Sequence, residues 1–484
     1  MISSSAALGG ADPRPYGLPA VPPGPPVRLV SARKQNELRR LSTLVILAGV
    51  LVAGMALLFA DTVEEAFRYP APFLGTALAL AFLVEARAGL RNLIRTDLFM
   101  LAVLYLLTFF EFLFPQPPIA QPVSMEAAET AVLATLLGFA GLVLGRHAFP
   151  ATRPLPSVIA LRVSPRTTML LLLGSALLGY LHMLVAVNFN VLEMIEQWSR
   201  PRFTQPWARG RLGGLSTLLN ELGLLIYLIP PLAASIFAQR QRFTMLQKAV
   251  AAALLLLVFY EGFAGGTRNI FLTHIITFTA AYALMLPRLR LLRVARVAVP
   301  LLALAWFALY YLPEIRTVGL SNFQLETART DALFVDMNLV NVALLSEVFP
   351  ARVGYLGFEI PFNAAIRPIP RAFWPGKPEG LSVGIEDALG VSGMTLSATF
   401  VGELWMAGGY LAILLGALCF GALAARWNRV GAGADTNLKL ILFAAGFFPA
   451  GICMRSFMSV APALLPLLAL WLFLRLNRKR RPGY

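Results

Sequence analysis

The chain has 484 residues, of which 58% are hydrophobic and 14% are charged, and its mean hydropathy is +0.70. Soluble domains carry about 25% charged residues, so this composition excludes a soluble protein and predicts an all-α polytopic membrane protein. The net charge of +16 fits Lys and Arg on cytoplasmic loops, and we expect no nucleic-acid partner. The two cysteines, Cys419 and Cys453, lie inside apolar runs, where we expect them to be core residues.

Residues 1–40 are rich in proline and then in basic residues, and they contain no apolar run. We interpret them as a disordered cytoplasmic tail whose basic end contacts anionic membrane lipids. From there the sequence predicts transmembrane helices one to nine over 41–312, a long loop over 313–395, helices ten to twelve over 396–475, and a basic cytoplasmic tail over 476–484. The twelve apolar runs are 41–60, 70–86, 97–114, 127–145, 168–188, 213–237, 246–264, 269–286, 297–312, 396–424, 438–453 and 456–475.

Charge placement predicts the orientation of these helices. With the N-terminus inside, the inner segments hold most of the 41 Lys and Arg residues. Short cytoplasmic loops are enriched in positive charge, whereas long loops are not counted by this rule. We therefore expect both termini in the cytoplasm and the 313–395 loop outside.

The long loop itself divides into two parts. Residues 321–349 have apolar positions at helical spacing, including Met337, Val340 and Leu344, and predict a helix. The proline-rich part that follows predicts irregular structure.

Cations and aromatic residues recur on the predicted outer side. Guanidinium groups bind phosphate oxygens, and aromatic rings stack on sugars, so these residues are candidates for substrate binding. The alternatives are an aromatic belt with Arg anchors at the headgroups, and Arg residues that pair with acids of the loop. The substrate-binding candidates are Arg200, Arg202, Arg209, Arg211, Arg367, Arg371, Lys377, Trp198, Trp207 and Trp374.

Three further residues are candidates for catalysis. Arg268 lies at the tip of a tight hairpin between the seventh and eighth runs, and Arg316 follows the ninth. Glu403, near the start of the tenth run, is our first choice for a general base, with Glu261 as another carboxylate near the outer face. Ionisable residues in spans face a cavity or a partner, so each could instead hold helices together.

Two stretches resemble the Wzy-type O-antigen polymerases, the oligosaccharide repeat-unit polymerases of bacterial envelopes. One runs from Arg367-Pro-Ile-Pro-Arg371 to Trp374-Pro-Gly-Lys-Pro378, and the other is 396–410, in which Gly402-Glu403 opens a span. The hairpin Gly266-Thr-Arg268 also fits. The resemblance implies a metal-independent glycosyltransferase of the bacterial cytoplasmic membrane, without cofactors, that acts on undecaprenyl-diphosphate-linked oligosaccharides. A chain-length regulator and a flippase would be further partners.

Other functions remain open at this stage. An O-antigen ligase shares the layout, but we would expect a histidine in its long loop. A transferase that uses polyprenyl-phosphate sugars would rely on acids such as Asp61, Glu64 and Glu65. A flippase of lipid-linked oligosaccharides would have a similar number of spans, although the two related halves typical of transporters are not evident.

Overall fold

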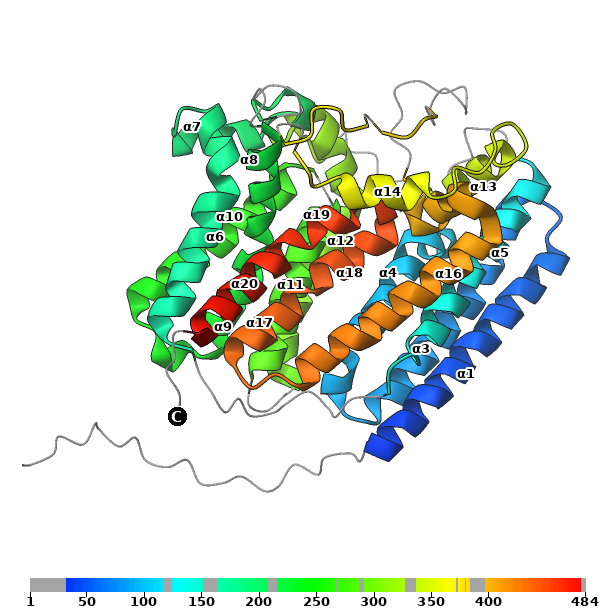
Figure 1. The fold of residues 1–484 in the computed structure, drawn as a ribbon, viewed down its shortest axis with the longest axis horizontal. Helices are drawn as coiled ribbons and strands as arrows, with labels where there is room; N and C mark the ends of the chain where they lie inside the picture. The colour runs from blue at the N-terminus through cyan, green and yellow to red at the C-terminus, as the bar shows by residue number, and fades with distance from the viewer. Residues whose placement is uncertain are drawn as a thin grey trace, which may run out of the picture.

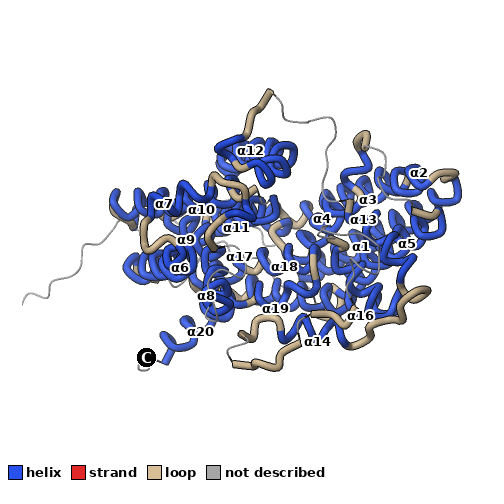
Figure 2. The backbone as a smooth tube through the Cα atoms, turned by 90° about the horizontal axis from the view of Figure 1, so that it is seen from above, coloured by secondary structure: helices blue, strands red, loops and turns tan. Residues whose placement is uncertain are grey.

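A computed structural model describes residues 32–116, 123–150, 163–207, 216–266, 268–286, 291–326, 337–370, 373–378, 380–383 and 397–479. These residues form helices joined by turns, with no strand among them. The helices run between an upper face, which carries α7 and α14 in Figure 1, and a lower face at which α1 begins. Seen from above, the helices form two groups with α17, α18 and α19 between them (Figure 2).

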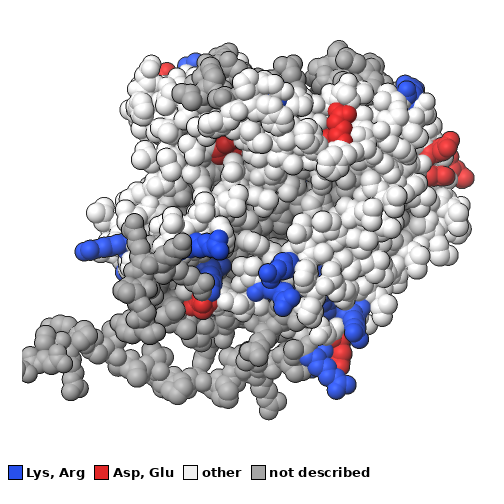
Figure 3. Space-filling view, viewed as in Figure 1, with Lys and Arg blue, Asp and Glu red and all other residues white. Residues whose placement is uncertain are grey.

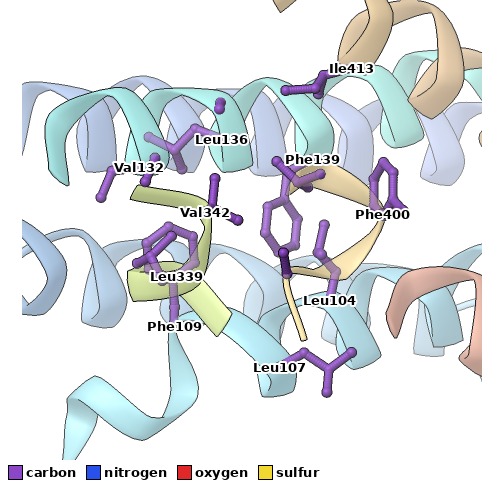
Figure 4. Close-up of a cluster of buried hydrophobic side chains, with 14 of the residues drawn as sticks. Leu104, Leu107, Phe109, Val132, Leu136, Phe139, Leu339, Val342, Phe400 and Ile413 are labelled. Carbon is purple, nitrogen blue, oxygen red and sulfur yellow. The ribbon is translucent and has the colours of Figure 1, made fainter. Parts of the chain in front are cut away.

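The first bundle is built around α5. Its helices are α1 (Ala32–Ala56), α3 (Pro70–Ala86), α4 (Thr96–Thr108), α5 (Met125–Gly145), α13 (Asn338–Val348) and α16 (Thr399–Ala432), with the short α2 (Val63–Arg68) beside them. Aromatic and branched side chains such as Phe109, Phe139 and Leu339 interdigitate in its core (Figure 4). Small residues allow close approach, since Gly141 and Gly145 of α5 lie against the backbone of α16.

The second bundle contains the middle of the chain and its C-terminal helix. Its members are α6 (Pro165–Ala186), α7 (Val191–Trp198), α8 (Ser216–Gly223), α9 (Ile229–Ala238), α10 (Met245–Ala264), α11 (Arg268–Met285), α12 (Leu291–Val318), α17 (Asn437–Ala445) and α20 (Leu465–Lys479). The helix α18 (Phe447–Arg455) joins the two bundles: the ring of Phe447 lies 5.1 Å from Phe99 of α4, and that of Phe448 lies 3.6 Å from Tyr227. The start of α18 is therefore held between the two bundles.

The prediction of an all-α membrane protein agrees with these helices, but the count of twelve spans is not confirmed. Among the described residues, nine helices are long and apolar enough to cross a membrane, and α12 makes a tenth if its two halves, bent by 56°, are one span. Each predicted run is helical over most of its described residues. However, α4 has only 13 residues, and α11 begins with Arg268 and Asn269 and is not among the nine.

The helix α16 is not one straight span. It breaks at Gly408 and Gly409, whose backbone angles are not helical, and Gly409 has a φ of 61°. The ring of Phe400, before the break, lies 5.6 Å from that of Phe420, after it. Residues 399–407 therefore fold back along the rest of α16. Because residue 420 is about 15 Å along the helix from residue 410, the segment begins well below the upper face.

The described part of the long loop agrees only partly with its prediction. Within the predicted helix 321–349, α13 covers 338–348, while Leu320–Asn322 forms a single 3₁₀ turn and 327–336 lie outside the described residues. The proline-rich part contains α14 (Glu359–Ile366) before it becomes irregular. In this helix Pro361 stands in the first turn, where its missing N–H costs no hydrogen bond.

Charged side chains are unevenly distributed over the surface. Figure 3 shows Lys and Arg gathered on the lower part of one face of the molecule. Many leucines on the helix surfaces are exposed, for example Leu51, Leu170 and Leu256. Exposed apolar helix surfaces between charged ends are what a multi-pass membrane protein presents to lipid.

Candidate functional site

Three arginines from different parts of the chain converge toward the upper face. Arg202 follows α7, Arg316 lies in the last turn of α12, and Arg455 ends α18. Burial lowers the pKa of the Arg202 guanidinium, the charge of Arg316 lowers it further, and Arg455 acts in the same direction. Glu261 is the carboxylate that opposes them. The sequence predicted Arg202 and Arg316 as site residues but missed Arg455.

Close backbone contacts hold these arginines together. Ser321, just after α12, donates its backbone N–H to the carbonyl of Ser199 at 3.0 Å. Gly319 also packs closely against the loop after α7, because a Cβ at Gly319 would lie 2.7 Å from the backbone oxygen of Ser199. Gly266, at the α10–α11 hairpin tip, adopts a φ of 62°, and a Cβ there would lie 2.4 Å from the Cα of Arg316. Glycine is needed there for both reasons.

Arg455 is tied to the same hairpin. With its carboxamide oxygen facing the guanidinium, Asn269 accepts hydrogen bonds from the Nε of Arg455 at 2.9 Å and from its Nη1 at 2.7 Å. Asn269 directly follows Arg268, the predicted catalytic residue, which is partly exposed at the start of α11. One sequence signal could have identified Arg455: it is a single charged residue between the two apolar runs 438–453 and 456–475.

Glu403 lies next to this cluster and fixes the turn that follows Arg455. Its Oε1 accepts a hydrogen bond from the hydroxyl of Ser456 at 2.7 Å, and its Oε2 accepts one from the backbone N–H of Met458 at 3.1 Å. Because residues 399–407 fold back, Glu403 approaches the turn from below rather than from the outer end of a straight span. The carboxylate therefore acts as the anchor of the 456–459 turn.

The C-terminal end of α14 covers this turn. Arg367 donates from Nη1 to the carbonyl of Met458 and to the hydroxyl of Ser459, both at 3.3 Å. Lys377 donates from Nζ to the carbonyls of Arg367 and Ile369, both at 2.9 Å, and so closes the loop between them. Arg367 thus lies beside the 456–459 turn. Lys377 instead stabilises the backbone of the loop that follows α14.

Two predicted substrate-binding residues lie elsewhere than expected. The ring of Trp198 is only 1% exposed, because it packs between Tyr180 and Tyr260 in the second bundle. It is a core residue and cannot stack on a sugar in this structure. Arg200 is exposed and pairs with Glu196 of α7 at 3.0 Å, one helical turn earlier, so it does not join the cluster.

The remaining predicted residues give less information. Trp207 is partly buried and donates to the side chain of Gln205 at 3.0 Å, and Trp374 is partly exposed in the loop after α14. Arg209, Arg211 and Arg371 lie outside the described residues. The acids of the alternative transferase lie around the start of α2, where Thr62 caps the helix and Glu65 accepts from the backbone of Asp61 at 2.9 Å.

Glu261 has a different environment from Glu403. It lies in the last turn of α10 and is 9% exposed. Its charge acts on Arg202 and on two buried tyrosines, Tyr180 and Tyr227. Within the described residues, neither its Oε2 nor the hydroxyl of Tyr180 has a hydrogen-bond partner. Buried polar atoms usually have hydrogen-bond partners, so both of these groups have unused hydrogen-bonding capacity.

A second polar cluster, at the lower face, was not predicted at all. Arg95 bridges Glu85 at 3.1 Å and Asp97 at 2.5 Å, and Arg146 lies 3.5 Å from Glu85 and 3.7 Å from Asp97. Ser42 of α1 donates to Glu85 at 2.7 Å. These side chains connect α1, α3, α4 and α5, which makes the cluster a structural junction of the first bundle.

Comparison with known proteins adds no further information about the site. No family model matches the chain, and no curated protein or solved structure is similar to it.

Proposed function

We propose that this protein is a glycosyltransferase that polymerises lipid-diphosphate-linked oligosaccharide units. The upper face is then the outer side of a bacterial cytoplasmic membrane, and both termini are cytoplasmic. The gathering of cations on the lower part of the molecule supports this orientation.

The observation that carries the proposal is the convergence of Arg202, Arg316 and Arg455, with Glu261 as the carboxylate whose charge acts on Arg202. Three cations beside the two carboxylates of Glu261 and Glu403 still leave an excess of positive charge at a partly buried place. Such an excess is suited to an anionic ligand, and a diphosphate offers several oxygens to guanidinium donors.

In the proposed reaction, the positive charge of the arginines stabilises the leaving group. A hydroxyl at the non-reducing end of one lipid-linked unit attacks the anomeric carbon of the growing chain, and the bond from that carbon to the undecaprenyl diphosphate breaks. The diphosphate leaves with the bonding electrons, and arginines around it stabilise the developing charge. Arg367, above the 456–459 turn, extends the cationic surface toward the incoming chain.

The proposal is tested with the full-length protein in liposomes, supplied with the lipid-linked units that accumulate in cells lacking it. Wild type should form long chains. Arg316→Ala and Arg455→Ala should lower this activity by about 100-fold or more, the effect of losing a preorganised charge contact in a transition state. Arg200→Ala is the control and should retain activity, because Arg200 forms only a surface pair with Glu196.

Two results would overturn the proposal: no chain growth by wild type, or normal chain growth by both the Arg316 and Arg455 variants. Transfer of lipid-linked units across the bilayer without chain growth would instead indicate a flippase.

A further inference from the structure

Two carboxylates, the buried Glu261 and the partly buried Glu403, lie near the arginine cluster, and their hydrogen bonds assign them different roles. Glu403 uses one oxygen for the Ser456 hydroxyl and the other for the Met458 backbone. Each such bond, if broken, leaves a buried polar group without its partner, which costs about 1–3 kcal/mol. A carboxylate that holds a turn in this way is poorly placed to accept a proton from a ligand.

Glu261 has an acceptor position that the described residues leave unfilled. Its Oε2 is buried and receives no hydrogen bond from them. An ionised carboxylate only accepts hydrogen bonds, so the group that completes this site must be a donor.

The hydroxyl of Tyr180 indicates which donor fits. It is also buried without a partner among the described residues, and the charge of Glu261 acts on it. An alcohol can donate one hydrogen bond and accept another, so a ligand hydroxyl has the hydrogen-bonding capacity that these two groups require. A phosphate oxygen lacks the proton that Glu261 requires, and an ammonium group cannot accept from the phenol.

We infer that Glu261, rather than Glu403, takes the proton of the acceptor hydroxyl, with Tyr180 orienting that hydroxyl. This inference rests on the proposed function. As the acceptor oxygen forms its bond to the anomeric carbon, its proton passes to Oε2 of Glu261 and the carbon–oxygen bond to the diphosphate breaks. Arg202 links the two halves of the site, because it interacts with Glu261 and also with Arg316.

The test separates binding from turnover. In Glu261→Gln, undecaprenyl diphosphate should bind at least as tightly as in wild type, because a negative charge beside the arginines is lost. Chain growth should fall by about 100-fold or more, the usual contribution of a general base. Tyr180→Phe should raise the acceptor KM more than it lowers kcat. Glu403→Gln should instead lower the thermal midpoint of the purified protein and weaken binding and turnover together.

The inference is overturned if Glu261→Gln grows chains within about threefold of wild type. It is equally overturned if this variant loses diphosphate binding in parallel with turnover, because the carboxylate would then act only in the architecture of the site. Absence of chain growth by wild type would be a different result, since it would refute the proposed function itself.

Discussion

The ring of Phe400 lies 5.6 Å from the ring of Phe420, whereas a continuous helix would separate these residues by about 30 Å along its axis. The contact exists because α16 reverses at Gly408 and Gly409. This reversal brings Glu403 to the 456–459 turn and so determines the geometry beside the arginine cluster.

Replacement of Gly409 should therefore destabilise the protein. Gly409 has a φ of 61°, and a Cβ there would lie 2.6 Å from the hydroxyl of Tyr355. The left-handed conformation alone costs a residue with a side chain about 1–2 kcal/mol. We expect Gly409→Ala to lower the thermal midpoint in detergent by several degrees.

The neighbouring glycine provides the control for this variant. Gly408 has an extended φ of 176°, and the nearest atom to a Cβ there is the Cβ of Ala412 at 3.4 Å. Gly408→Ala should therefore lower the midpoint less. If both substitutions lowered the thermal midpoint equally, the positive φ of Gly409 would not be the cause of the destabilisation.

The sequence predicted the helices well and the fold-back not at all. Long apolar runs can only be buried in lipid or in a core, so their helical structure follows from composition. Gly408 and Gly409 stand inside such a run, where paired glycines also occur in straight membrane helices. The reversal becomes evident only from contacts across it, such as the packing of Leu404 against Gly416 and of Phe400 against Phe420.

The candidate site could be predicted only in part, because some of its contacts join residues far apart in the sequence. Arg202 and Arg316 stood out because cations on the predicted outer side need an explanation. Trp198 stood beside them in the sequence, but its burial against Tyr180 depends on helices far along the chain. Arg455 had no neighbouring cation or aromatic cluster, and its contact with Asn269 exists only after folding.

The lower-face cluster should contribute strongly to stability. Glu85 is fully buried and accepts hydrogen bonds from Ser42, Asn92 and Arg95. Its neutralisation leaves Arg95 and Arg146 with one remaining carboxylate, and removing one partner of a buried pair costs about 3–5 kcal/mol. We expect Glu85→Gln to lower the thermal midpoint and the yield of monodisperse protein on size-exclusion chromatography.

Glu37→Gln is the matched control for this change. The pair of Glu37 and Arg33 is exposed, with side chains 62% and 92% accessible, so it should contribute at most about 1 kcal/mol. A midpoint for Glu85→Gln as high as that for Glu37→Gln would contradict a structural role for the cluster.

The same cluster makes stability depend on pH through His147. Burial and the nearby charges of Arg39 and Arg146 lower the pKa of this imidazole to about 4. In the unfolded chain its pKa is about 6.5, so between these values the unfolded state binds the proton and the folded state does not. Stability from this group is therefore complete above about pH 6.5 and is lost as the pH falls toward 4.

Thermal midpoints measured from pH 7 to pH 5 check this relationship. His147→Asn should show a shallower decline than wild type, although the difference should be only about 1–2 °C because the imidazole is only partly buried. Parallel curves for the two proteins would show that His147 does not contribute to the decline.

Gly266 links the hairpin to the arginine cluster, and its replacement should reduce activity as well as stability. A side chain there would require a φ of 62° and would displace Arg316, whose Cα lies 2.4 Å from the Cβ position. Misplacing a charge by about 1 Å in an active site can cost about 100-fold in rate. We expect Gly266→Ala to lower chain growth by about 10- to 100-fold in liposomes.

Gly174→Ala in α6, where no atom lies within 4 Å of the added carbon, should keep wild-type activity. If Gly266→Ala matched that control, the position of Arg316 against the hairpin would have no part in the reaction.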